Sequence, residues 1–178
     1  MDFFDAIRSR GSYRGEFEIG SVPREDLALI LEAGVRAPSG LNMQTTTFYA
    51  VTDQELRKKI SEVFPTKAVE TAPIILVITS KLVYAEESQM QFEIEDYSAA
   101  TENMLLAITA LGYQSCWFEG HITDTDRIGD KMARILNVPE DYELVCFLPV
   151  GVAEDEPKHP RKKPFEERAW FNGFPKGE

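Results

Sequence analysis

Cysteine is scarce in this chain, and long hydrophobic runs are absent. The two cysteines, Cys116 and Cys146, lie in apolar surroundings without Cys-x-x-Cys spacing. Neither a disulfide framework nor a zinc site is expected, and both residues are interpreted as small core residues. The apolar runs, such as residues 74–78, are far too short to span a bilayer, and residues 1–5 carry acids where a signal peptide carries bases. These absences predict a cytoplasmic protein with no membrane partner.

Basic residues are also few. The chain has 19 Lys and Arg against 30 Asp and Glu, which gives a net charge of -11. Nucleic acids bind basic faces, so no nucleic-acid partner is expected. The 178 residues, with a hydrophobic share of 43% and a charged share of 28%, suit one globular core. We predict a single domain over residues 1–178, in which residues 154–178 form a C-terminal arm.

Several chemical signatures are missing as well. The sequence has no Gly-x-Gly-x-x-Gly after a strand, no Walker loop, no Gly-x-Ser-x-Gly elbow, no His-rich constellation and no internal repeat. An enzyme without an evident nucleophile, metal or acid–base pair usually takes its chemistry from a cofactor. We therefore expect no metal and no catalytic side chain.

Hydrophobic periodicity predicts both helices and strands. Helices are expected at residues 3–7, from Pro23 to a central loop, after Asp53, over residues 97–111 and from Thr123. Strands are expected at residues 48–51, 74–79, 113–118 and 144–150. The helix over residues 97–111 is apolar on more than one side, which is typical of a helix near a dimer interface. Residues 81–95 are interpreted as a lid or as the entrance to that helix.

The central loop, residues 36–48, combines constraint with polarity. Pro38 disfavours a helical Ala37, and Gly40 allows a close backbone approach. Ser39, Asn42 and Gln44 supply donors and acceptors that suit a polar heterocycle or a ribityl chain. The alternative is a capped helix end followed by an ordinary loop.

Two basic segments stand out in this acidic chain. In an extended segment Arg10, Ser12 and Arg14 point the same way, and two guanidinium groups beside a hydroxyl form an anion site. The alternative is a solvated basic stretch. The second segment, residues 158–163, precedes aromatic residues, so we expect this tail to pack on the body or on a second subunit and not to be disordered.

Along nearly its full length the chain resembles the nitroreductase family of flavin-dependent oxidoreductases. The resemblance rests on the order and spacing of several short pieces. These are residues 10–14 (Arg-Gly-Ser-Tyr-Arg), residues 37–44 (Ala-Pro-Ser-Gly-Leu-Asn-Met-Gln), the helix over 96–112 with Asn103, residues 117–120 (Trp-Phe-Glu-Gly), residues 149–151 (Pro-Val-Gly) and residues 161–164 (Arg-Lys-Lys-Pro).

The resemblance implies an α+β fold built on a mixed sheet, in a domain-swapped homodimer with one FMN in each of two interface sites. It implies hydride transfer from NADH or NADPH to a small-molecule acceptor, such as a nitroaromatic or a quinone, by a ping-pong mechanism. The alternatives are a protein of the same fold with other chemistry, such as dehalogenation or flavin breakdown, and a non-catalytic flavin-binding protein.

The resemblance also implies a set of cofactor-binding residues. Arg10, Ser12 and Arg14 would hold the phosphate and the N1/O2 side of the flavin, and Arg161 or Lys162 would complete the phosphate site. The loop of the other subunit would line the ring and ribityl, and a backbone N–H at Glu119 and Gly120 would face flavin N5. The full set is Arg10, Gly11, Ser12, Arg14, Pro38, Ser39, Gly40, Asn42, Gln44, Trp117, Phe118, Glu119, Gly120, Arg161 and Lys162.

The chain departs from the family pattern in a few places. Thr45 and Thr46 stand where many members have Pro-Trp, so the pocket wall is expected to differ. Lys162 replaces an arginine of the tail motif, and residues 81–95 match no subgroup.

Overall fold

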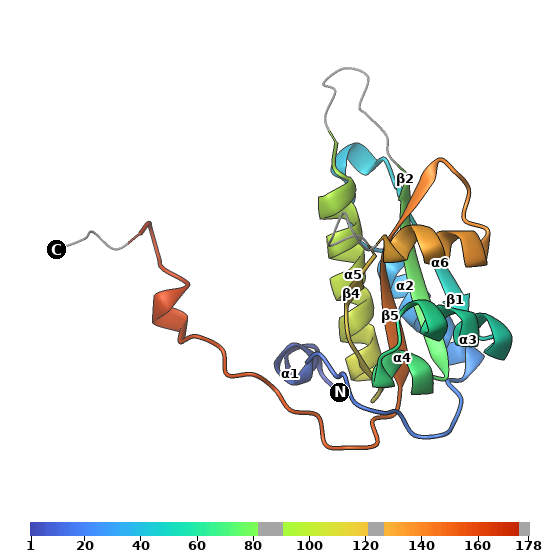
Figure 1. The fold of residues 1–178 in the computed structure, drawn as a ribbon. Helices are drawn as coiled ribbons and strands as arrows, with labels where there is room; N and C mark the ends of the chain where they lie inside the picture. The colour runs from blue at the N-terminus through green and yellow to red at the C-terminus, as the bar shows by residue number, and fades with distance from the viewer. Residues whose placement is uncertain (82–90, 121–126, 175–178) are drawn as a thin grey trace.

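The computed structural model describes residues 1–81, 91–120 and 127–174. A β-sheet forms its centre, with helices on both faces (Figure 1). One face is covered by α2 (Arg24–Val35) and α5 (Glu93–Ala110), and the other by α3 (Gln54–Val63), α4 (Lys67–Thr71) and α6 (Ile128–Leu136). The predicted α+β class is confirmed, but every strand pairing in the described residues is antiparallel, so the sheet is not the mixed one that the resemblance implied.

The strand order is β1-β2-β5-β3, and β4 also pairs with β5. All these pairings are antiparallel, and the strands are β1 (Thr46–Val51), β2 (Ile74–Lys81), β3 (Gln114–Ser115), β4 (Phe118–Glu119) and β5 (Tyr142–Gly151). The central strand β2 is buried on both faces, as its continuous β-branched run predicts. Its side chains alternate, so Leu76 faces the α2 and α5 layer, whereas Val77 faces the other.

The prediction of one strand over residues 113–118 is wrong. The structure has two short strands there, separated by Cys116 and Trp117. The register pairs Ser115 with Val150 and Phe118 with Phe147, which places Pro149 opposite Cys116. A proline has no N–H to donate to the neighbouring strand, so the pairing is interrupted at this point.

Most predicted helices are confirmed. Asp53 caps α3, because its carboxylate accepts a hydrogen bond from Leu56 N–H at 2.9 Å. Helix α5 begins earlier than predicted, at Glu93, and Gly112 follows it with a φ of +90°. The lid interpretation of residues 82–90 and the cap at Thr123 fall outside the described residues. No helix in the described ranges is long and apolar enough to cross a membrane.

The N-terminal segment and the start of the C-terminal arm lie side by side on the body. Helix α1 (Phe3–Ser9) packs beside α5, and Phe17 bridges to Ala153 at the start of the arm. Farther along, the arm runs away from the body, and its described residues contain one short 3-10 helix, η2 (Phe165–Glu167) (Figure 1). Phe171 is 85% exposed and Phe174 82% exposed. The aromatic tail therefore does not pack on its own subunit, and packing on a second subunit stays a prediction.

Candidate functional site

The central loop leaves α2 and enters β1 in a strained conformation. It contains a short 3-10 helix, η1 (Gly40–Asn42), and three non-glycine residues with positive φ: Leu41 at 50°, Asn42 at 56° and Gln44 at 52°. L-residues rarely adopt this left-handed region, so contacts outside the backbone must hold the loop. The Asn42 and Gln44 side chains are exposed, which leaves amide groups at the surface.

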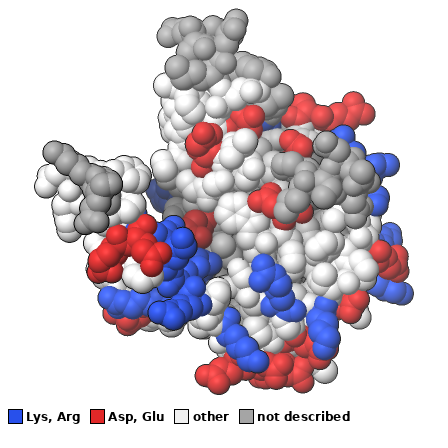
Figure 2. Space-filling model, turned by 60° about the vertical axis from the view of Figure 1, so that its left-hand side comes forward, with Lys and Arg blue, Asp and Glu red and all other residues white. Residues whose placement is uncertain are grey.

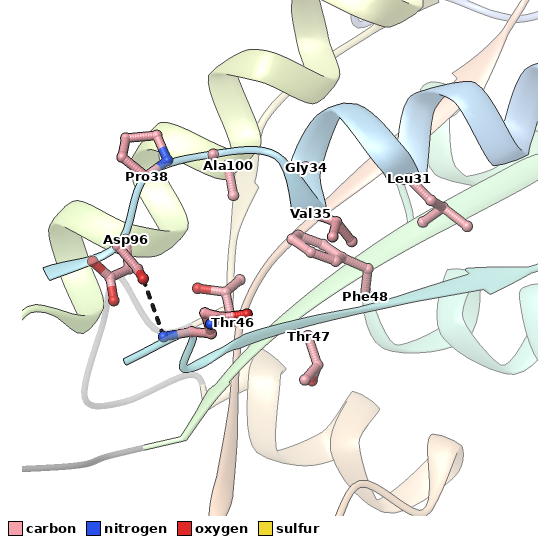
Figure 3. Close-up of a pocket in the computed structure, with 12 residues that line it drawn as sticks. Leu31, Gly34, Val35, Pro38, Thr46, Thr47, Phe48, Asp96 and Ala100 are labelled. Carbon is pink, nitrogen blue, oxygen red and sulfur yellow. Dashed lines mark hydrogen bonds between the residues drawn. The ribbon is translucent and has the colours of Figure 1, made fainter. Parts of the chain in front are cut away.

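A cavity of about 430 Å³ lies beneath this loop (Figure 3). Pro38 and Asp96 lie at one end, and Leu31 and Phe48 at the other, with Thr46 between them. The Thr46 hydroxyl is buried and has no hydrogen-bond partner within the described residues. The cavity therefore offers a polar end and an apolar end, and Thr46 forms part of the altered wall that the sequence predicted.

Gly40 has a different role from the one predicted. A side chain at Gly40 would collide with the Phe92 ring, and its N–H donates to Asp96 Oδ1 at 2.7 Å. The close approach that Gly40 allows is therefore to Phe92 of the same chain. Ser39 also acts within the loop, because its hydroxyl accepts a hydrogen bond from Gln44 N–H at 3.1 Å.

The second candidate segment, residues 10–14, runs in extended form beside β3. Tyr13 N–H donates to Ser115 O at 2.8 Å and the Tyr13 side chain is buried, whereas the next residue, Arg14, is exposed. This alternation confirms the predicted extended geometry. Arg10 forms an ion pair with Glu102 at 3.1 Å, but Arg14 has no ion-pair partner in the part of the chain that the structure describes. Arg14 therefore presents an uncompensated cation.

Residues 117–120 lie next to this segment, along β5. The Phe118 ring packs against Phe64 and Phe147, and the buried indole N–H of Trp117 finds no acceptor among the described residues. Gly120 N–H donates to Val145 O at 2.8 Å. Of the two residues whose backbone N–H was predicted to face flavin N5, Gly120 already donates its N–H to the sheet, so within this turn the prediction now rests on Glu119.

The absence of a side chain at Gly120 serves the fold. A Cβ there would collide with Leu144 O and would lie 3.2 Å from the Gly129 Cα. Gly120 thus lets the start of α6 approach β5. Glu119 pairs with Cys146 across the same strands, and His121 falls outside the described residues.

The arm passes the cationic segment before it leaves the body. A side chain at Gly11 would meet the His159 ring, so the N-terminal segment and the arm of the same chain are in contact there. Arg161 and Lys162 follow on the exposed arm. Figure 2 shows one face of the molecule, on which Lys and Arg gather at the lower left with acidic side chains beside them.

The structure does not bring all the predicted residues together. The loop of residues 38–44 leads into β1, which is one edge of the sheet, whereas residues 10–14 lie beside β3 at the other edge. Three strand spacings separate these edges, about 14 Å. The predicted site residues of one chain therefore form two separate groups, which we call half-sites, and Gly11, Ser12 and residues 117–120 belong to the second group.

Sequence reasoning missed two residues that hold these half-sites, Asp96 and Glu102, and it placed Thr45 in the pocket wall without its hydrogen bond to Asp96. Asp96 is 4% exposed and binds the central loop, and Glu102 binds Arg10. An acid in the first turn of a helix usually indicates only a favourable interaction with the helix dipole. The partners of Asp96 lie more than fifty residues earlier in the sequence, so no local pattern indicates them.

Neither cysteine belongs to the candidate site as a reactive group. Both are free and buried, which confirms the prediction that they are core residues. Burial raises the pKa of the Cys146 thiol to about 12 and also raises the pKa of Cys116, although Arg14 and Ser12 oppose the shift at Cys116.

Comparisons with known proteins agree with the fold. A protein of Methanothermobacter thermautotrophicus with the provisional name NADH dehydrogenase/NAD(P)H nitroreductase is 30% identical over 158 residues, which cover 88% of this chain and 80% of the relative. The iodotyrosine deiodinase of Thermotoga neapolitana is 26% identical over 90% of this chain and 94% of its own. The solved structure of an FMN-dependent nitroreductase from Clostridium difficile R20291 superposes with a TM-score of 0.80 at 26% identity, over 96% of this chain and 99% of the other. Residues 7–68 and 64–152 match the profile of the Nitroreductase family, and the chain belongs to that family.

Proposed function

We propose that this member of the nitroreductase family, an NAD(P)H-dependent flavin oxidoreductase, is a homodimer with one FMN at each of two sites between its subunits. It passes electrons from NADH or NADPH to a small acceptor such as a nitroaromatic or a quinone. The observation that carries the proposal is the separation of two half-sites in one chain, at opposite edges of one sheet. A two-fold axis places the loop of one subunit against the cationic segment of its partner.

The residues present fit this cofactor. Arg10 and Ser12 lie in one segment, and Arg161 and Lys162 add positive charge on the neighbouring arm. Such a donor set suits a terminal phosphate. On the loop, the exposed amides of Asn42 and Gln44 suit ribityl hydroxyls and the edge of a heterocycle.

When bound, FMN supplies the hydride chemistry, and the protein binds and orients it. Arg10 is held by Glu102 before any ligand arrives, so little ordering entropy is lost when its guanidinium meets an anion. Arg14 would place a positive charge beside the part of the ring that becomes more negative on reduction. Pro38 and Ser39 of the partner subunit would exclude water from the ring.

This function predicts a yellow protein that releases FMN, not FAD, on denaturation. NADH or NADPH should bleach the colour, and a quinone or a nitroaromatic should restore it. Since both substrates must come within about 3–3.5 Å of the same flavin atom, they bind in turn and double-reciprocal plots should be parallel. Bound FAD, or a colourless protein that takes up no added FMN, would contradict the cofactor assignment. Converging plots would contradict a single site at which the two substrates stack on the flavin in turn.

Reductive dehalogenation is the second candidate function, because an iodotyrosine deiodinase is 26% identical over most of both chains. Steady-state kcat/KM for iodotyrosine and for a nitroaromatic, measured on one preparation, separates the two activities. A flavin that neither NADH nor NADPH bleaches would instead indicate a non-catalytic flavin-binding protein.

A further inference from the structure

A buried carboxyl group at the start of α5 binds the central loop at both ends. Asp96 is 4% exposed, its Oδ1 accepts a hydrogen bond from Gly40 N–H at 2.7 Å, and its Oδ2 accepts one from the Thr45 hydroxyl at 3.2 Å. No ion-pair partner of Asp96 lies within the described residues. A buried carboxyl without a cation is costly, so this group contributes little to stability by its charge.

The backbone between these two contacts is the strained part of the loop. Leu41, Asn42 and Gln44 all have positive φ. Asparagine tolerates this region better than leucine or glutamine, and the loop contains no glycine at these positions. The two contacts to Asp96 therefore hold the backbone on either side of these residues.

The same helix holds the other half-site. Glu102 lies six residues after Asp96 on α5, about 9 Å along the helix axis, and binds Arg10. Helix α5 therefore fixes one contact of each half-site, and Asp96 is its contact with the loop. The Phe92 ring, just before α5, supports the loop from the same direction, because it occupies the space beside Gly40.

We propose that Asp96 is a positioning residue, which holds residues 40–45 in the strained conformation that binds FMN. Asp96 acts through the loop, since its carboxyl oxygens are occupied by Gly40 and Thr45. This inference rests on the proposed function. Through Asp96, helix α5 preorganises the loop, whose own sequence does not favour this conformation.

The test compares Asp96→Ala with Asp96→Asn, and uses Glu95→Gln as the matched control. Glu95 is an exposed acid in the same helical turn, and it forms no hydrogen bond or ion pair with the described residues. Loss of two hydrogen bonds should raise the Kd of the Asp96→Ala apoprotein for FMN by about ten- to a hundredfold. Asp96→Asn should recover most of this affinity, because its carbonyl oxygen still accepts from Gly40 N–H and its amide can donate to the Thr45 hydroxyl. Glu95→Gln should bind FMN as the wild type does.

Amide hydrogen exchange of residues 40–45 in the apoprotein supplies a readout that does not depend on FMN. Exchange at Gly40 should be faster by about tenfold in Asp96→Ala, and by less in Asp96→Asn. If Asp96→Ala fails to fold, Thr45→Val removes one contact and should raise both the exchange rate and the Kd by a smaller factor. If a folded Asp96→Ala protein shows the wild-type exchange rates and the wild-type Kd for FMN, the inference about Asp96 is overturned, whereas the proposed function is not. A wild-type protein that binds no FMN would overturn the proposed function, and the exchange rates would still decide whether Asp96 holds the loop.

Discussion

A chain that ends at Pro164 is expected to be monomeric and to retain little FMN. This truncation removes Phe165, Trp170, Phe171 and Phe174, which are exposed by 61%, 39%, 85% and 82% on one subunit. Burying a side chain of this size contributes about 1.5–3 kcal/mol, so the four of them provide a large share of the free energy of any dimer that covers them. The basic residues Arg161 and Lys162 remain, so loss of FMN would report loss of the second subunit and not loss of phosphate-binding charge.

Sedimentation equilibrium and the ratio of flavin to protein measure both effects. The matched control is a chain that ends at Phe174, which keeps all four aromatic residues and should stay dimeric and yellow. A truncated chain that remains a fully flavinated dimer would show that the aromatic tail has no role in assembly.

Arg14→Ala is expected to lower the reduction potential of the bound flavin. Arg10 is already neutralised in part by Glu102, whereas Arg14 is exposed and has no ion-pair partner in the described ranges. The uncompensated cation favours the more negatively charged, reduced cofactor. Losing one charge-assisted contact costs about 1.5–3 kcal/mol, which corresponds to a drop of about 30–65 mV for a two-electron couple.

A redox titration against a reference dye measures this shift. Arg14→Lys keeps the charge and should recover most of the potential, and Lys59→Ala removes an exposed cation on α3, outside the candidate site, and should change nothing. Hydride transfer from NAD(P)H should slow in Arg14→Ala, while oxidation of the reduced enzyme by its acceptor need not. An unchanged reduction potential would show that Arg14 does not stabilise the reduced flavin, and that Arg10 or another residue supplies the positive charge.

The fold was largely predictable because its elements are locally encoded. The β-branched run of residues 74–78 and the cap at Asp53 both predict the elements that the structure shows. The break between β3 and β4 was not predictable, because it arises opposite Pro149, a residue more than thirty positions later. Strand pairing over such separations has no local signal.

The candidate site was predictable in its residue types but not in its arrangement. The polar character of residues 38–44 is visible in the sequence, but the positive φ of Leu41 is not. Gly40 and Gly120 both looked like places for a ligand, yet one accommodates Phe92 and the other accommodates the start of α6. A glycine indicates a close approach without identifying the approaching group.

Mixing two defective subunits tests the shared site most directly. One subunit carries Arg10→Ala and Arg14→Ala, and the other carries Asn42→Gly and Gln44→Gly, in which glycine accepts the left-handed backbone and removes the amides. Each homodimer should bind FMN poorly, because both of its sites lack one half. Co-expression gives heterodimers in which one site combines the two intact halves, so roughly a quarter of all sites should regain FMN and NAD(P)H oxidation. Mixed preparations with no more FMN than either parent would contradict a site built from two subunits.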